Sequence, residues 1–254
     1  MTALPDAGGS GIRGQLRVSP LDALQPIGSV SGYTAASRGR ISDYVYDELC
    51  EAIRSLRLQP GASLSEPVVA TWLGVSRAPV REAFTRLADQ RLITVVPQVR
   101  SQVAPISMRD VSDAVFVRNS LETGAFRQAI DAHVLDLSEL QGVVDLNREA
   151  FDQRDAEAFF ETDEQLHRLV FSLAGVSRLW GFVRGMKVNL DRLRHLSLGV
   201  AVDNPELCTE HQAIVDALAN RDEEAGMAVI HTHTHRVLTD SARLQSSFPD
   251  FFAP

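Results

Sequence analysis

Apolar positions in the first part of the chain recur with the period of about 3.6 residues that predicts amphipathic helices. The first predicted helix begins near Ile41 and ends at Gln59-Pro60-Gly61, where proline and glycine stop the pattern. Ser65-Glu66-Pro67 is typical of a helix cap followed by proline, and the short helix that it opens ends near Gly74. Ser76 then predicts the cap of a third helix.

Two short runs with strand-like composition follow the third helix. The segments LITVVP and QVAPI, separated by Gln98–Ser101, predict a β-hairpin. From Met108 to about Leu244 the spacing is helical throughout, which predicts a bundle. Its expected helices lie near residues 108–132, 136–152, 155–175, 177–199, 203–220 and 222–244. The predicted fold is therefore mainly α, with an N-terminal winged helix-turn-helix followed by a C-terminal antiparallel all-helical bundle.

These patterns divide the chain into four parts. The first residues are rich in glycine, serine, alanine and proline without a sustained period, which is typical of a mostly disordered arm. The expected boundaries are residues 1–38 for the arm, 39–106 for the winged domain, 107–245 for the helical domain and 246–254 for a tail.

The net charge of −8 is unevenly distributed between the two predicted domains. Residues 1–105 contain 11 basic and 9 acidic residues, whereas residues 106–254 contain 14 basic and 24 acidic residues. The acidity therefore belongs to the helical part, and the front part can approach phosphate without net repulsion.

Neither cysteine usage nor hydropathy indicates an exported or membrane protein. Cys50 and Cys208 lie far apart and match no metal or redox spacing. No apolar run approaches the roughly 18 residues of a transmembrane helix, and the first residues lack the features of a signal peptide. We expect a cytoplasmic protein with reduced cysteines and no membrane partner.

The helix, short helix, tight turn, helix and hairpin predicted for the front part together describe a winged helix-turn-helix. The turn Leu73-Gly74-Val75-Ser76 supplies the glycine that a sharp interhelical corner needs. Arg77 and Arg81 are four residues apart and share one face at the start of the second helix, the part of a recognition helix that enters the major groove. A helical corner with two solvated arginines is the alternative interpretation, and the hairpin that follows argues against it.

The stretch LQPGASLSEPVVATWLGVSRAPVREAFTRLADQRLITVVPQVRSQVAPIS closely resembles the DNA-binding domain of GntR-type regulators, and the resemblance covers roughly residues 41–106. It implies that Ser76, Arg77 and Arg81 contact operator DNA, with a wing at Gln98–Ser101. Gln98 and Arg100 are the expected contacts of that wing.

This sequence departs from the family pattern at three positions. Pro67 stands where arginine is frequent, Arg91 where glycine usually precedes the hairpin, and Arg100 where the wing tip usually has glycine. The usual operator sequence is therefore not implied.

Three helices of the predicted bundle each direct an imidazole toward the core. Asp163 and His167 are four residues apart on an apolar face, and His211 and His233 lie on apolar stripes of two later helices. Any one of these histidines alone would be a hydrogen-bonded core residue, but the four groups together favour a metal site of nitrogen and oxygen ligands. Zinc is the first expectation, with nickel, manganese or iron as alternatives. His231 and His235 are expected at the surface.

The segments VRNSLETGAF, DEQLHRLVFSLAG, EHQAIVDALANRD and IHTHTHR resemble the FCD domain of the FadR-like branch of GntR regulators over about 130 residues. The resemblance implies that Asp163, His167, His211 and His233 bind a divalent metal beside a ligand cavity. One departure is Val176-Ser177, where asparagine often follows the glycine of the metal helix.

Arg118 lies on an apolar stripe of its helix and is expected to face the bundle, where its guanidinium could bind an organic acid. An ion pair with Glu122 or Asp163 is the alternative. Asn189 and Arg192 are further effector-binding candidates, from helical position alone.

Together these features predict a homodimeric DNA-binding transcription regulator, with repression as the default, controlled by a small carboxylate bound beside the metal. A dimer is expected because two-fold symmetry matches a palindromic operator. Direct metal sensing is the first alternative. A metal-dependent hydrolase is disfavoured, because the sequence contains no HExxH motif, nucleophile elbow or glycine-rich phosphate loop.

Overall fold

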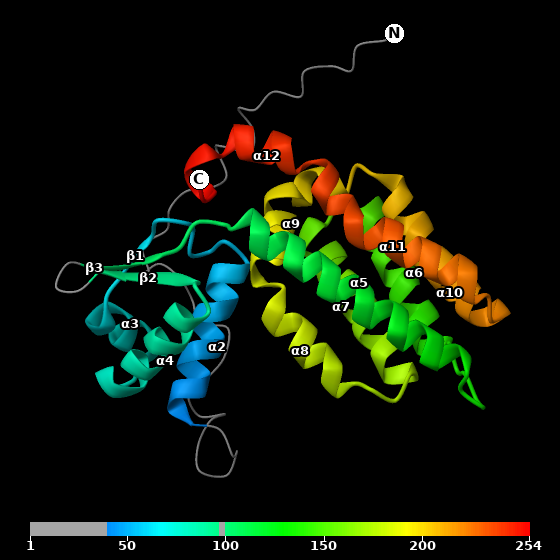
Figure 1. Ribbon diagram of the computed structural model, residues 1–254, viewed down its shortest axis with the longest axis horizontal. Helices are drawn as coiled ribbons and strands as arrows, with labels where there is room; N and C mark the ends of the chain where they lie inside the picture. The colour runs from blue at the N-terminus through cyan, green and yellow to red at the C-terminus, as the bar shows by residue number, and fades with distance from the viewer. Residues whose placement is uncertain (1–39, 97–99) are drawn as a thin grey trace, which may run out of the picture. The chain divides into compact units, whose positions relative to one another are not determined.

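The computed structural model describes residues 40–96 and 100–254. Two compact units result: one contains residues up to Ile106 together with Gln245–Pro254, and the other contains Ser107–Leu244 (Figure 1). The predicted arm of residues 1–38 and the wing residue Gln98 lie outside the described residues. The expectation of a mainly α fold, with a winged helix-turn-helix and a helical bundle, is confirmed.

The first unit contains three helices and a small antiparallel sheet of order β1-β3-β2. Its helices are α2 (Ile41–Arg54), α3 (Glu66–Leu73) and α4 (Arg77–Asp89), and its strands are β1 (Ser63–Leu64), β2 (Ile93–Val96) and β3 (Arg100–Val103). The predicted hairpin is present, but its second strand lies at Arg100–Val103 rather than at QVAPI. β1 was not predicted, because two residues are too few for an alternating pattern to be recognised.

Local chemistry explains where the two helices of the helix-turn-helix begin and end. The Ser65 hydroxyl accepts a hydrogen bond from the Val68 backbone N–H at 3.4 Å, which caps α3 as predicted. Gly74 ends α3 with φ of 67°, a left-handed conformation that favours glycine. Ser76 occupies the N-cap position of α4, but among the described residues its side chain makes no capping bond. That part of the prediction is wrong.

The second unit is all-helical. Its helices are α5 (Met108–Ile130), α6 (Ser138–Asp152), α7 (Ala156–Leu173), α8 (Arg178–Met186), α9 (Val188–Ala201), α10 (Pro205–Asn220) and α11 (Glu223–Thr239), and α12 (Ser241–Ser247) crosses into the first unit. Two predicted helices are each divided. The segment 177–199 is interrupted at Lys187, and the segment 222–244 is interrupted at Asp240.

The long helix α5 packs against α7, α8, α9 and α11, so it lines the centre of the bundle (Figure 1). Gly226 permits the close approach of α11, because a Cβ atom there would lie 1.9 Å from Cζ of Phe126 on α5. This contact fixes the face that α11 turns toward the core. Within the described residues, no helix combines the length and hydrophobicity needed to cross a membrane.

The C-terminal tail belongs to the first unit. The Ile106 backbone N–H donates to the Phe251 carbonyl at 2.7 Å, and the Ala253 N–H donates to the Ile106 carbonyl at 2.9 Å. These bonds form a parallel bridge between Ile106 and Phe252. Phe252 is buried, with 8% of its surface exposed. The last residues therefore pair with a residue that lies some 145 positions earlier in the chain.

We expect Phe252→Ala to destabilise the first unit by about 3 kcal/mol, because truncating a buried phenylalanine leaves a cavity. Trp72 lies in the first unit and Trp180 in the second, so urea unfolding of the Trp180→Phe protein, followed by fluorescence, reports the first unit. Phe182→Ala is the matched control, because that side chain is exposed on α8. The three proteins compared are Trp180→Phe alone, Trp180→Phe with Phe252→Ala, and Trp180→Phe with Phe182→Ala. If all three unfold at the same urea concentration, the tail does not stabilise the first unit.

Candidate functional site

The first candidate site is the exposed start of α4. Ser76, Arg77 and Arg81 are all exposed there, as the sequence predicts for a recognition helix. The opposite face of α4 is buried in the first unit through Val80, Ala83, Phe84 and Leu87. The structure therefore presents the predicted contact residues to solvent on a helix anchored by its apolar side.

Arg81 is held by an acidic partner that sequence reasoning missed. Its Nε and Nη2 atoms donate to Oε1 and Oε2 of Glu66 at 3.0 and 2.9 Å. The hydrogen bonds from Arg81 lower the pKa of Glu66, so the fork is ionised at neutral pH. The Arg81 side chain is still 71% exposed, so the pair orients the guanidinium more than it stabilises the fold.

The wing is described only in part. Arg100 begins β3, where it is paired with Val96 of β2. The predicted wing contact Gln98 lies outside the described residues, as does the tip of the hairpin.

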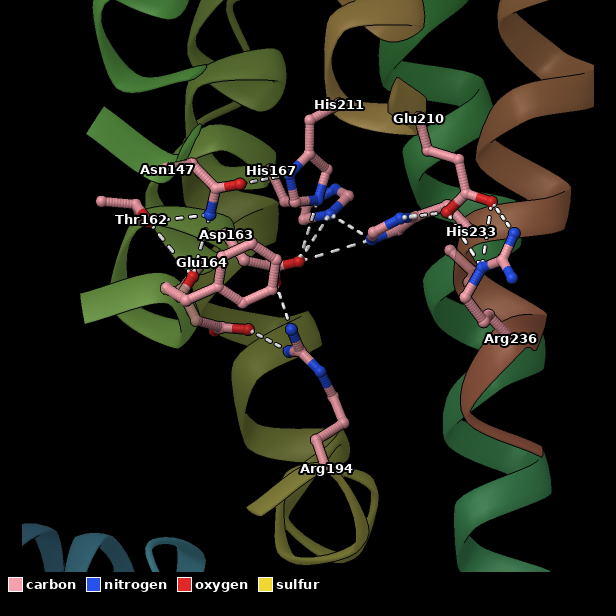
Figure 2. A network of polar contacts seen from close by, with 12 residues as sticks. Asn147, Thr162, Asp163, Glu164, His167, Arg194, Glu210, His211, His233 and Arg236 are labelled. Carbon is pink, nitrogen blue, oxygen red and sulfur yellow. Dashed lines mark hydrogen bonds and ion pairs between the residues drawn. The ribbon is translucent and has the colours of Figure 1, made fainter. Parts of the chain in front are cut away.

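The second candidate site is a buried cluster in the helical unit. Asp163 and His167 lie on α7, His211 on α10 and His233 on α11, and one ligand atom from each lies within 4.8 Å of all the others. Figure 2 shows the three imidazoles converging on the Asp163 carboxylate. Their Nε2 atoms lie 3.9, 3.2 and 3.4 Å from Asp163 Oδ1 for His167, His211 and His233 respectively. The structure thus brings together all four residues predicted as metal ligands.

A polar acceptor holds the Nδ1 atom of each imidazole. His167 Nδ1 lies 2.8 Å from Glu122 Oε2, and His211 Nδ1 lies 2.8 Å from Asn147 Oδ1. His233 Nδ1 lies 3.0 Å from Glu210 Oε2 (Figure 2). Asn147 Oδ1 and Glu210 Oε2 are hydrogen-bond acceptors, and Glu122 Oε2 makes an ion-pair contact. In a neutral imidazole, a proton on Nδ1 leaves Nε2 with a lone pair that faces the cluster.

This arrangement fits a metal ion. His167 Nε2 and His233 Nε2 lie 3.1 Å apart, and two nitrogens bound to one ion at about 2.1 Å are roughly 3.0 to 3.4 Å apart. Two unprotonated nitrogens at this distance repel each other unless a proton or a cation lies between them. The donor set of three imidazoles and one carboxylate suits Zn, Ni, Mn or Fe.

Burial and neighbouring charges set the protonation of the cluster. Burial lowers the pKa of His211 to about 4, and burial also lowers the pKa of His167. Burial alone would raise the pKa of Asp163, but Arg194 and the histidines outweigh it and hold the pKa well below its usual value. Burial would likewise lower the pKa of His233, but hydrogen bonds to Asp163 and Glu210 outweigh it, so the pKa is raised.

A cavity of about 90 Å³ adjoins the cluster, and its lining includes Asp163 and His233. This volume is several times the roughly 15 Å³ that one water requires, so a small organic molecule fits. Three arginines line the same cavity: Arg118, Arg194 and Arg236.

Arg118 forms the ion pair with Glu122 that the sequence offered as one interpretation, and it also lines the cavity. It is 2% exposed, and its Nε donates to Glu122 Oε1 at 2.6 Å. Its Nη2 atom is buried and meets no hydrogen-bond acceptor among the described residues. Leaving such a donor buried without an acceptor costs about 1 to 3 kcal/mol, and the Arg118 residue is among those that line the cavity.

Arg194 is a cavity residue that sequence reasoning missed. Its guanidinium donates to Asp163, and to Glu164 Oε1 at 2.7 Å, and it lies 4.5 Å from the centre of the Phe160 ring (Figure 2). The break at Lys187 explains the omission, because α9 does not continue the helical phase of a segment that begins at Ser177.

Asn189 and Arg192, predicted from that continuous phase, are buried elsewhere. Arg192 Nη1 donates to Asn189 Oδ1 at 2.8 Å, and Asn189 Nδ2 donates to Asp110 Oδ2 at 3.2 Å. Neither residue is among those that line the cavity beside the cluster in the described part of the chain.

Both parts of the chain match known protein families. Residues 41–103 match the bacterial regulatory proteins of the gntR family, and residues 113–236 match the FCD domain. These ranges contain the helix-turn-helix and all four members of the buried cluster.

Relatives of similar length are transcription regulators. A helix-turn-helix regulator from an unstable DNA locus of Streptomyces ambofaciens is 34% identical over 82% of this chain and 88% of its own. The transcriptional repressor RspR of Escherichia coli K12 is 30% identical over 84% of this chain and 94% of its own. Among solved structures, E. coli McbR/YncC has a TM-score of 0.67 at 22% identity, covering 82% of this chain and 99% of that one. This last likeness supports the fold alone.

Proposed function

The chain belongs to the GntR family of DNA-binding transcription regulators, and we propose that a divalent metal and a small carboxylate together control its binding to operator DNA. Its relatives are regulators and not enzymes. In the proposed function the chain acts as a repressor, as RspR is named, and binds a palindromic operator as a homodimer.

One observation carries the proposal. Arg118, whose buried Nη2 atom has no hydrogen-bond acceptor in the described part of the chain, lines the same cavity as Asp163 and His233 of the buried cluster. A carboxylate is the ligand that satisfies both, because one oxygen can accept from the guanidinium while the other faces the metal position.

Asp163, His167, His211 and His233 are the residues that would hold the metal. When bound, the ion would supply a positive centre that attracts oxygen ligands and fixes their orientation. Four protein ligands leave two positions on a six-coordinate ion, and the carboxylate or water would take them. Glu122, Asn147 and Glu210 orient the imidazoles, and such partners typically change metal affinity by 10- to 100-fold.

Arg118 and Arg194 would bind the carboxylate, and aromatic rings would form the apolar wall. Phe159 and Phe160 are among the residues that line the cavity. The small volume favours a compact acid over a long-chain one.

The proposed signal leaves the helical unit through α11 and α12. His233 is a metal ligand on α11, and Val237 and Asp240 of the same segment line the cavity. The chain then continues through α12 into the tail, which is hydrogen-bonded to Ile106 of the first unit. A ligand that changes the end of α11 can therefore act on the DNA-binding unit through the chain itself, to the extent that its affinity differs between the two states.

We expect Arg77→Ala to weaken specific DNA binding by 10- to 100-fold, because each recognition-helix contact contributes about 1 to 3 kcal/mol. The DNA is the duplex most enriched by selection with the wild-type protein, and binding is measured by fluorescence anisotropy. Arg178→Ala on α8 is the control, because it removes an exposed arginine of the helical unit. Unchanged affinity in Arg77→Ala would overturn the assignment of the recognition helix.

We expect about one divalent ion per purified chain and its loss in His211→Ala, as measured by elemental analysis. Asn147→Ala should keep the four ligands and weaken metal affinity 10- to 100-fold, because His211 Nδ1 loses its acceptor. His133→Ala is the control, since this exposed histidine lies outside the cluster. A metal content that is the same in wild type and His211→Ala would contradict the proposed site.

We expect the zinc-loaded protein to bind at least one acid in a calorimetric panel of acetate, lactate, malonate, gluconate and citrate. Arg118→Lys should weaken that binding at least tenfold, because lysine keeps the charge opposite Glu122 but loses the guanidinium fork. Metal content must stay unchanged for this result to count. If no acid binds and DNA affinity follows zinc concentration alone, the regulator senses the metal directly.

A further inference from the structure

Helix α11 carries two histidines outside the buried cluster. His231 and His235 are one helical turn apart, on a face different from that of the buried His233. Their rings are stacked, with centroids 4.1 Å apart and an angle of 19° between the ring planes. His231 is exposed and His235 is half-buried, so solvent reaches the pair.

The hydrogen bonding of His235 leaves one nitrogen available as a ligand. Its Nδ1 atom lies 2.8 Å from the backbone carbonyl oxygen of His231. A carbonyl can only accept, so Nδ1 carries the proton and Nε2 keeps its lone pair. In the buried cluster, Glu122, Asn147 and Glu210 likewise contact Nδ1 and leave Nε2 facing the metal position.

The donors around the pair favour a late first-row transition metal. Met227 lies one turn before His231, so a thioether and two imidazoles occupy successive turns of one stripe. The nearest cationic side chain along the helix, Arg236, is engaged with Glu206 and Glu210. Imidazole and thioether donors bind copper and nickel more readily than calcium or magnesium.

We propose that His231 and His235, with Met227 one helical turn before them, form a second and solvent-accessible site for a transition metal, with copper preferred over nickel and zinc. The preference follows the general order of affinity of divalent ions for nitrogen ligands. The site is independent of the buried cluster and goes beyond the function proposed above. It joins two successive turns of α11, so metal binding stabilises the helix that carries His233.

The first test is the copper stoichiometry of the full chain, measured by titration with Cu²⁺. The wild-type protein should bind one equivalent more than His235→Ala or His231→Ala. Met227→Leu should keep the stoichiometry and weaken the binding. His133→Ala is the matched control, because it removes an exposed histidine from another segment.

The second test is retention of the untagged protein on a resin that carries Ni²⁺. Wild type, His133→Ala and His211→Ala should be retained, whereas His235→Ala should pass through. Loss of retention in His211→Ala, or equal stoichiometry in wild type and His235→Ala, would overturn the surface site. A missing ion in the buried cluster would leave these results unchanged, so the two proposals fail separately.

Discussion

The helical unit is organised around one buried carboxylate, that of Asp163. Removing a carboxylate from water is costly unless it is paired and hydrogen-bonded, and Asp163 is surrounded by three imidazoles and by Arg194. The carboxylates of Glu122 and Glu210, which contact the imidazoles of His167 and His233, are themselves paired with arginines. Glu122 pairs with Arg118, and Glu210 pairs with Arg236. Helices α5, α6, α7, α9, α10 and α11 all contribute to this network. Replacing one member leaves another buried without its partner, so the network fixes how these helices pack.

The packing of α11 places the C-terminal half of this helix beside the cavity. Close packing at Gly226 and Phe126 sets the orientation of the helix, and His233 then faces Asp163. Two turns further on, Asp240 lines the cavity and ends the helix. The chain re-enters the first unit at Gln245, soon after Asp240. In sequence, the cavity residues of α11 are therefore close to the tail that pairs with Ile106.

The four cluster residues could be predicted because their spacing is a local property of helices. Asp163 and His167 share a face by the i, i+4 rule, and each of the other histidines lies on an apolar stripe. The partners Glu66 and Arg194 could not be predicted in this way, because their contacts join different helices. The break at Lys187 was not predicted either, because a single glycine such as Gly185, two residues earlier, is tolerated inside a helical pattern and does not by itself indicate an end. Lys187 is buried between Glu164 and Asp191, and the tertiary ion pair with Glu164 favours this interruption.

Arg194 links the two ligands of the proposed function. Its guanidinium shares the Asp163 carboxylate with the three imidazoles, so a divalent ion at the cluster would compete with it for the same negative charge. A weakened hold on Asp163 would leave the guanidinium available to a carboxylate in the cavity. Binding of the two ligands would then be cooperative, and linkage requires that the carboxylate raise metal affinity by the factor by which the metal raises carboxylate affinity. A half-buried arginine that contacts the cluster and lines the cavity therefore favours joint recognition of metal and acid over two independent binding events.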